Sequence, residues 1–234
     1  MRNDLTIRWI GQGGYLLSDG ETEICIDPYL SDVVNRVAGR ARMVEPPFAP
    51  EALKSDLVIC THDHLDHIDI DAIPKMDKSI PFAAPTHAEK TLRSCGVTRY
   101  MPFDEGQTYR VGAFEIEAVY AHHSVPAVGV LVRHGGLALY ISGDTEYDAR
   151  LEGLKDKKID LMIICINGRL GNMNAVDAAR LTKILSPKVA IPTHYGMFES
   201  NTADPVEYTG KIPHSAVLQY DREYDVKELF SCLT

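Results

Sequence analysis

The chain has 234 residues, of which 45% are hydrophobic and 24% charged; this is ordinary globular usage and excludes intrinsic disorder. The formal net charge is −9 at pH 7, whereas a nucleic-acid-binding protein usually carries a basic patch. Arg36, Arg40 and Arg42 are the only basic cluster before residue 150, and we interpret them as part of a solvated loop, so nucleic acid is not the expected partner.

The sequence also predicts a cytoplasmic protein without a membrane partner. The first residues contain no apolar stretch of signal-peptide length, and no run approaches the ~20 apolar residues that a membrane span needs. The chain is too large to depend on disulfides, and its cysteines form no C-x-x-C pair. They are Cys25, Cys60, Cys95, Cys165 and Cys232.

Strands fill the first 30 residues of the predicted fold. Residues 5–10, 15–17 and 23–26 are rich in apolar side chains, and the Asp19-Gly20 turn between the last two is a hairpin signal. Residues 11–14 lack the Gly-Lys-Ser/Thr ending of a phosphate loop, so we interpret them as a tight turn. Residues 31–56 are predicted to be a long loop with a short helix at 32–37, and loops of this length are often functional.

The rest of the chain alternates between strands and helices. Thr86 and Glu89 form a capping-box pattern for a helix that ends near Gly96, and Asn174 is the predicted N-cap of a helix that stops at Ser186. The pattern predicts an α/β fold, two sheets between helices, with residues 1–234 as a single domain. Further strands are expected at 56–60, 81–84, 107–111, 114–120, 128–133, 137–141, 160–166 and 189–191.

Four potential metal ligands follow the apolar strand at 56–60. Imidazole suits zinc, iron or manganese, and carboxylates suit the harder ions. Side chains two residues apart in an extended segment point the same way, so the first two histidines are expected to face one space. The four residues are His62, His64, Asp66 and His67.

Further ligand candidates stand where other apolar strands end. They are His122 or His123 after the strand at 114–120, Asp144 after the strand at 137–141, and His194 after the strand at 189–191. Rigid strands commonly present functional groups at their ends. A single loop cannot complete a site for two ions, so we expect these segments to supply the remaining ligands.

The motifs occur in the order H-x-H-x-D-H, then a His, then Gly143-Asp144-Thr145, and finally a C-terminal His. This order resembles that of the metallo-β-lactamase superfamily. The resemblance extends over nearly the whole chain and implies a four-layer αβ/βα sandwich. Within the superfamily, residues 167–169, 171–174 and 191–198 look like the branch that contains L-ascorbate-6-phosphate lactonase. The chain departs from that branch by having only Leu170 between the first two of these segments.

The resemblance implies two divalent metal ions, zinc or manganese with iron as a further option. One ion is assigned to His62, His64 and His123. His123 is chosen over His122 because the corresponding ligand precedes Ser-x-Pro in similar enzymes. The other is assigned to Asp66, His67 and His194, with Asp144 bridging both. Asp66 and Asp144 are the predicted catalytic residues, and Asp66 is expected to orient the attacking water.

Several other residues near these segments receive predicted roles. Arg169 is interpreted as an anion contact, because guanidinium groups bind phosphate and carboxylate through paired hydrogen bonds. Asn167, Tyr195 and His122 are assigned with it to substrate binding. Asp27 either supports a ligating histidine or caps the end of its strand. We expect His87, His134 and His214 to be solvated.

The leading functional hypothesis is a metal-dependent hydrolase. It opens a small anionic lactone, a phosphorylated sugar-acid lactone in the branch it resembles, through a metal-bridging hydroxide. The sequence itself does not reveal the oligomeric state, but similar lactonases assemble as homo-oligomers, so the resemblance makes a homo-oligomer an option here. The alternatives are a metal-dependent phosphodiesterase or ribonuclease of the same fold, and a metal-binding protein without catalytic activity.

Overall fold

The apolar runs of the sequence form strands in two sheets that pack face to face in a computed structural model, which describes residues 5–231. Among these residues, the first sheet has the strand order β13-β1-β2-β3-β4-β5-β6. Its strands are β1 (Thr6–Gly11), β2 (Gly14–Ser18), β3 (Glu23–Ile26), β4 (Leu57–Ile59), β5 (Phe82–Ala84), β6 (Tyr100–Pro102) and β13 (Glu223–Asp225).

The second sheet has the order β12-β11-β10-β9-β8-β7 among the described residues. Its strands are β7 (Thr108–Val111), β8 (Phe114–Tyr120), β9 (Val128–His134), β10 (Leu137–Ile141), β11 (Leu161–Cys165) and β12 (Val189–Thr193). Strand β11 is buried along its whole length, as its uninterrupted apolar run predicts.

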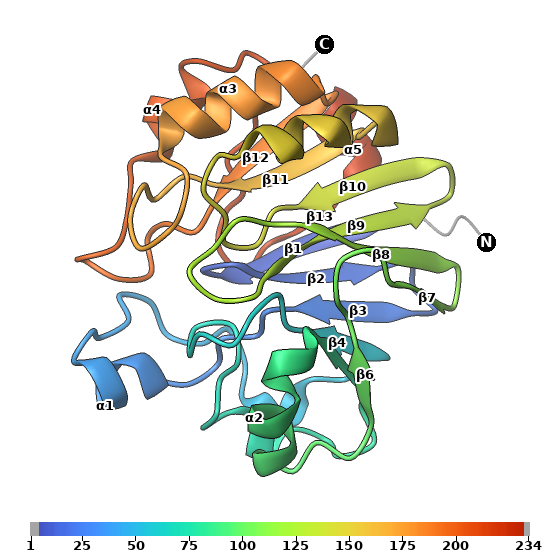
Figure 1. Cartoon of the computed structure of the whole chain (residues 1–234), viewed down its shortest axis with the longest axis vertical. Helices are drawn as coiled ribbons and strands as arrows, with labels where there is room; N and C mark the ends of the chain where they lie inside the picture. Colours follow the sequence, from blue (N-terminus) through green and yellow to red (C-terminus); the bar gives the residue numbers. More distant parts are fainter. Residues whose placement is uncertain (1–4, 232–234) are drawn as a thin grey trace.

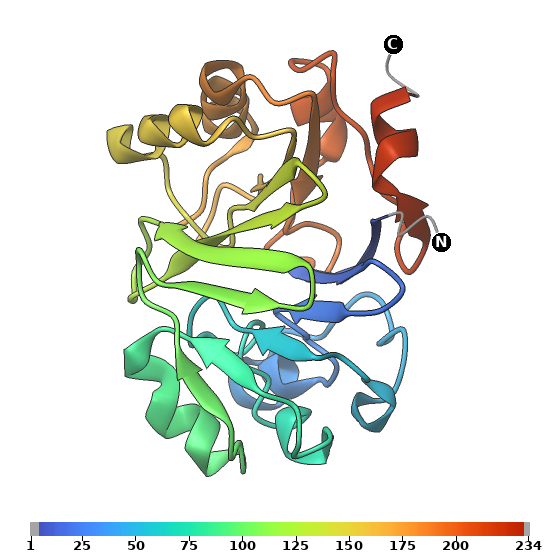
Figure 2. The same ribbon diagram turned by 90° about the vertical axis from the view of Figure 1, so that its right-hand side faces the viewer.

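Helices cover the outer faces of the two sheets. Figures 1 and 2 show α2 against the first sheet and α3 against the second. The α-helices are α1 (Val33–Ala38), α2 (Glu89–Ser94), α3 (Ala175–Leu185), α4 (Pro205–Thr209) and α5 (Val226–Ser231), and the 3₁₀ helices are Pro50–Ala52, Ile73–Lys75, Thr86–Ala88 and Ala149–Lys157. The prediction of an α/β fold with two sheets between helices is confirmed.

Two hydrophobic clusters hold these layers together. The larger one joins inward-facing residues of the first sheet, such as Tyr15 and Ile24, to Val130 and Leu139 of the second. A separate cluster joins the outer face of the first sheet, including Phe82, to α2. Burial of apolar surface in the larger cluster fixes the two sheets relative to each other, and burial in the second cluster fixes α2 on the first sheet.

Helix starts were predicted with mixed success. Asn174 accepts hydrogen bonds from the backbone N–H groups of residues 176 and 177 at the start of α3, as expected. The predicted capping box at Thr86 is wrong. The Thr86 backbone N–H and hydroxyl both donate to the carboxylate of Asp104, and residues 86–88 form a 3₁₀ turn before α2. No helix among residues 5–231 is long and apolar enough to cross a membrane.

Candidate metal centre

Strand ends from both sheets meet at one edge of the molecule. Strands β3, β4 and β5 run parallel in the first sheet. In the second sheet, β8, β10, β11 and β12 share one direction, because β9 lies antiparallel between β8 and β10. The loops that follow β4, β8, β10 and β12 gather on the left side of Figure 1. This edge therefore collects the segments that carry the predicted ligands.

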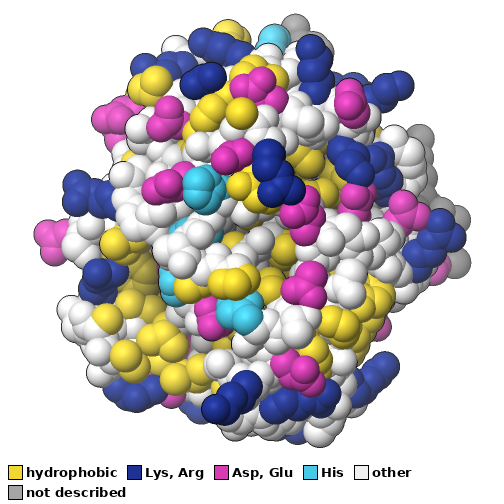
Figure 3. All heavy atoms as spheres, viewed as in Figure 1, with side chains coloured by type: hydrophobic (Ala, Val, Ile, Leu, Met, Phe, Trp, Pro, Cys, Tyr) yellow, Lys and Arg dark blue, Asp and Glu magenta, His cyan; other side chains and the backbone are white. Residues whose placement is uncertain are grey.

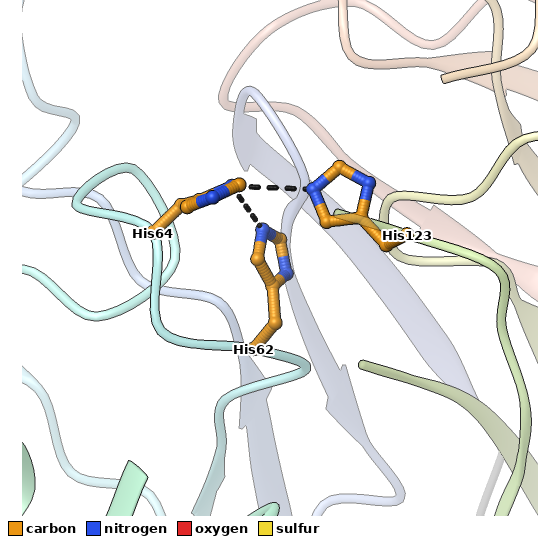
Figure 4. Close-up of side chains that lie close together, drawn as sticks. All are labelled: His62, His64 and His123. Carbon is orange, nitrogen blue, oxygen red and sulfur yellow. Dashed lines mark hydrogen bonds between the residues drawn. The ribbon is translucent and has the colours of Figure 1, made fainter. Parts of the chain in front are cut away.

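The first group of ligands consists of three histidines from two sheets (Figure 4). His62 Nε2 lies 3.0 Å from His64 Nδ1, and His123 Nε2 lies 3.2 Å from the same atom. His123 Nδ1 donates a hydrogen bond of 2.9 Å to the carbonyl oxygen of Gly171. A Cβ at Gly171 would lie only 2.8 Å from that nitrogen, and the residue has φ +87°, so glycine is required for this close approach.

The second group consists of Asp66, His67 and His194. His194 Nε2 lies 3.6 Å from Asp66 Oδ2, and His67 Nε2 lies 3.8 Å from it. Asp144 stands between the groups: its Oδ1 is 3.0 Å from His194 Nε2 and 3.3 Å from His67 Nε2, and it also clusters with His62. The structure thus brings together all seven residues that the sequence assigned to metal binding.

These spacings fit the donor set of two cations. Ligands about 2.0–2.2 Å from a tetrahedral metal ion are separated by about 3.3–3.6 Å from one another, which is close to the spacings here. His67 Nε2 and Asp144 Oδ1 are buried and have no hydrogen-bond partner among the described residues. Buried polar atoms normally have partners, so both atoms are suited to bind cations.

The electrostatics of the cluster favour bound cations as well. Burial, reinforced by neighbouring histidines, lowers the pKa of His62 and His64, which leaves both imidazoles neutral and able to donate a lone pair. Burial opposes ionisation of Asp66 and Asp144, but His67 and His194 lower the pKa of both carboxyls. The ligand set therefore presents two carboxylates and the two neutral imidazoles of His62 and His64 to one space. At His67 and His194 burial opposes the positive charge, but the surrounding carboxylates raise the pKa of both imidazoles, so that an incoming cation has to displace a proton from them.

Of the two roles left open for Asp27, the structure shows support of a ligating histidine, and the cap that Asp27 provides is on the segment after β4 instead of on its own strand β3. Asp27 Oδ2 lies 2.7 Å from His67 Nδ1, and Asp27 also accepts hydrogen bonds from the backbone N–H and the hydroxyl of Thr61, at 2.8 Å and 2.7 Å. Asp27 thus orients a ligating histidine and caps the segment that carries His62. Support of this kind sets ligand orientation and affinity in metal sites.

Gln12 and Asn172 were missed as supporting residues. Gln12 Nε2 donates to Asp66 Oδ2 at 2.8 Å, and Asn172 Nδ2 donates to Asp144 Oδ2 at 2.8 Å. Gln12 lies in the turn between β1 and β2, which we had interpreted only as a tight turn. Gln12, Asp27 and His194 have positive φ values of 51°, 45° and 63°. Such backbone conformations are uncommon outside glycine and concentrate at functional sites.

A cavity of about 470 Å³ opens beside the ligands, and His64, Asp66, Asp144 and His194 line it. The four residues predicted to bind substrate do not line this cavity. His122 is exposed, lies 3.4 Å from Asp148 and lines a separate cavity of about 430 Å³, together with His123.

The other three residues predicted to bind substrate, Asn167, Tyr195 and Arg169, are either packed in the protein interior or directed to solvent outside the cavity. Asn167 is buried and donates to Asn201 at 2.8 Å. Tyr195 is buried against Trp9, with ring centroids 5.1 Å apart. Arg169 is exposed, and the cavity wall is formed by its neighbour Leu170 instead. Loop conformation, which the sequence does not determine, decides which side chain of this segment faces the cavity.

The other histidines are absent from the cluster, as expected, but one of them is not solvated. His134 is 9% exposed and its Nε2 lies 3.0 Å from Asp19 Oδ2, so the prediction of a solvated turn residue was wrong. The packing of the β9–β10 hairpin against the β2–β3 turn buries it. His87 lies 3.1 Å from Asp63 and is partly exposed, and His214 is exposed.

Comparison with known proteins identifies the family of this chain. The family model of the beta-lactamase superfamily domain matches residues 22–195. A UPF0173 metal-dependent hydrolase of Archaeoglobus fulgidus is 29% identical over 220 residues, covering 87% of this chain and 89% of the relative. A similarly named protein of Thermus thermophilus is 29% identical over 217 residues, covering 88% of each chain.

A solved structure has the same fold. The metallo hydrolase Igni18 of Ignicoccus hospitalis superposes with a TM-score of 0.77 at 22% identity, over 94% of this chain and 97% of that one. The resemblance to the superfamily, stated from the motifs, is confirmed. The resemblance to the ascorbate-6-phosphate lactonase branch remains a prediction.

Proposed function

This chain belongs to the beta-lactamase superfamily domain family, and from that membership we propose that it is a metal-dependent hydrolase that opens a small anionic lactone. Relatives named metal-dependent hydrolases cover most of the chain, which supports the hydrolase part of the proposal. The lactone part rests on the motif resemblance and on the cavity beside the ligands.

One observation carries the proposal. Seven donor side chains from two sheets converge in three overlapping groups. Two of their buried donor atoms, His67 Nε2 and Asp144 Oδ1, make no hydrogen bond among the described residues, and their close charged neighbours are each other, Asp66 Oδ2 and His194 Nε2. We assign His62, His64 and His123 to one ion, Asp66, His67 and His194 to the other, and Asp144 to both. When bound, two divalent ions supply Lewis acidity and a water whose pKa is lowered toward ~7.

The protein's own residues hold and orient the reacting groups. Asp66 lines the cavity and its Oδ2 is fixed by the Gln12 amide, so it is placed to orient a water beside the substrate carbonyl. Asn172 fixes Asp144 in the same way. Hydrolysis adds water across the ring C–O bond and yields a hydroxy acid.

A covalent route through a cysteine is not part of the proposal. Cys25, Cys60, Cys95 and Cys165 are buried, and burial raises the pKa of Cys165 to about 11. A buried thiol with a raised pKa is a poor nucleophile. Cys232 lies outside the described residues.

The test is a turnover screen on protein loaded with zinc or manganese, with iron as a third condition and metal content measured by elemental analysis. Lactones, phosphodiesters and thioesters are compared. We expect lactone hydrolysis with close to two equivalents of metal per chain. Cleavage of RNA or a model phosphodiester without lactone turnover would favour the phosphodiesterase alternative. Tight metal binding without any turnover would favour a non-catalytic metal-binding protein.

A further inference from the structure

The cavity beside the metal ligands has a wall that the proposed function does not explain. Apart from the ligands, its lining consists of four apolar side chains, two neutral polar side chains and one arginine. These residues are Val34, Leu65, Leu170 and Phe198, then Ser124 and Asn201, and finally Arg40. Figure 3 shows hydrophobic side chains gathered at the lower left, over the part of the fold where Figure 1 places α1.

Arg40 differs from the two arginines beside it in the sequence. The Arg36 guanidinium binds both carboxylate oxygens of Asp71, each at 2.7 Å. Arg42 donates to backbone carbonyls of residues 31 and 44 and lies over the Tyr29 ring at 4.8 Å. Arg40 makes no hydrogen bond or ion pair with any of residues 5–231, and among these residues it is the single Lys or Arg that lines the cavity. A guanidinium free of internal partners is available to an anion.

The apolar wall combines one exposed side chain with buried ones. Leu170 is 57% exposed, although it is a large hydrophobic residue. It has a positive φ of 55° between Gly168 and Gly171, which also have positive φ values. This turn holds Leu170 at the cavity. Val34 and Phe198 are buried neighbours in one hydrophobic cluster and form another part of the wall. Ligand cavities with apolar walls and a few placed polar groups bind largely apolar molecules.

The wall offers little to a substrate rich in hydroxyl groups. Each hydroxyl that leaves water needs a hydrogen-bond partner to offset its desolvation. Ser124 and Asn201 are the neutral polar side chains of the lining, and Asn201 Oδ1 already accepts a hydrogen bond from Asn167.

We infer that Arg40 selects an amphiphilic substrate: a lactone or ester with an apolar body of several carbons and one carboxylate or similar anionic group. The apolar body packs against Leu170, Phe198 and Val34, while Arg40 binds the anion. This inference rests on the proposed hydrolase function and keeps its anionic substrate. In place of the sugar ring that the branch resemblance implies, the inferred substrate has a hydrocarbon body.

The experiment compares three lactones on the metal-loaded protein. They are a γ-lactone whose alkyl side chain ends in a carboxylate, the methyl ester of the same compound, and glucono-δ-lactone. Arg40→Gln is expected to reduce the ratio of kcat/KM for the carboxylate over the methyl ester by about 10- to 100-fold. Arg169→Gln, an exposed arginine outside the cavity lining, is the matched control and should leave that ratio unchanged.

Three results would each overturn the inference. The first is an unchanged kcat/KM ratio in Arg40→Gln, and the second is an equal loss of that ratio in Arg169→Gln. The third is faster wild-type cleavage of glucono-δ-lactone than of the alkyl carboxylate. A second pair of variants tests the wall: Leu170→Ser should raise KM for both alkyl lactones, whereas Val206→Ser, at an exposed valine of α4, should not.

A binding measurement separates this inference from the proposed function. Calorimetry with azelate, a straight-chain dicarboxylate, on metal-loaded protein does not require turnover. If no lactone is hydrolysed, the proposed function fails. The inference is still supported if Arg40→Gln binds azelate at least about 10-fold more weakly than Arg169→Gln does. Equal affinities of the two variants would overturn it.

Discussion

His67 Nδ1 lies 2.7 Å from Asp27 Oδ2, and both side chains are fully buried. The carboxylate fixes the imidazole tautomer in which Nδ1 carries the proton and Nε2 is free to bind a cation. The same carboxylate holds the Thr61 backbone. Asp27 therefore determines the position of ligands that belong to both metal groups.

Replacement of this carboxylate should weaken metal binding more than it weakens the fold. We expect Asp27→Asn to lower divalent metal affinity about 10- to 100-fold, as measured by competition with a chelator. Asp19→Asn is the matched control, because Asp19 and His134 form a similar buried pair at 3.0 Å at the opposite edge of the sheets. Both variants should unfold at lower temperature. Equal metal affinities in the two would refute the role of Asp27.

Asp144 is expected to be indispensable for activity. Its carboxylate offsets the repulsion between two cations, and a neutral amide does so poorly. Asp144→Asn should reduce kcat by at least about 100-fold and retain the circular dichroism spectrum of the wild type. Turnover at the wild-type rate would remove Asp144 from the site.

His122 and His123 should respond differently to substitution. His123 lies 3.2 Å from His64, whereas His122 is exposed beside Asp148. We expect His123→Ala to lose about one equivalent of bound metal in elemental analysis, because the first group then has only two histidines left. His122→Ala is the control and should retain both equivalents. The opposite result would show that the register at the end of β8 is wrong.

Protons should compete with metal ions at His194. Burial opposes its positive charge, but Asp144 at 3.0 Å raises its pKa to about 9. Below that pH the imidazole of the metal-free protein carries a proton, which an incoming ion must displace. Metal affinity should therefore rise as the pH increases toward 9. Calorimetry at pH 7 in buffers of different ionisation enthalpy should detect proton release, and binding without it would contradict this prediction.

The ligands could be predicted because their positions depend on local sequence. Each stands directly after an apolar strand, and strands that run in one direction end at one edge of their sheet. The pattern of apolar runs therefore predicted the described strands except β6 and β13, together with the approximate place of the site. Asn174 was predicted for the same reason, because its hydrogen bonds reach only two and three residues along the chain.

The residues that were missed depend on contacts between distant segments. Gln12 reaches Asp66, 54 residues away, and becomes recognisable only after the β1–β2 turn has packed beside the metal ligands. Thr86 failed as a helix cap because Asp104, 18 residues away, binds its donor groups. Arg40 lines the cavity and Arg169 does not, which the sequence could not show because the conformations of two loops decide which arginine reaches the cavity.

The seven ligands are divided between the sheets, residues 62–67 following the first and residues 123, 144 and 194 following the second. A nascent chain in which only one sheet has formed offers each ion an incomplete coordination shell. Metal retention therefore distinguishes fully assembled molecules from partly assembled ones, since binding free energy is gained only after the sheets dock. We therefore expect metal to bind late in folding, and chains whose sheets have not docked to remain metal-free.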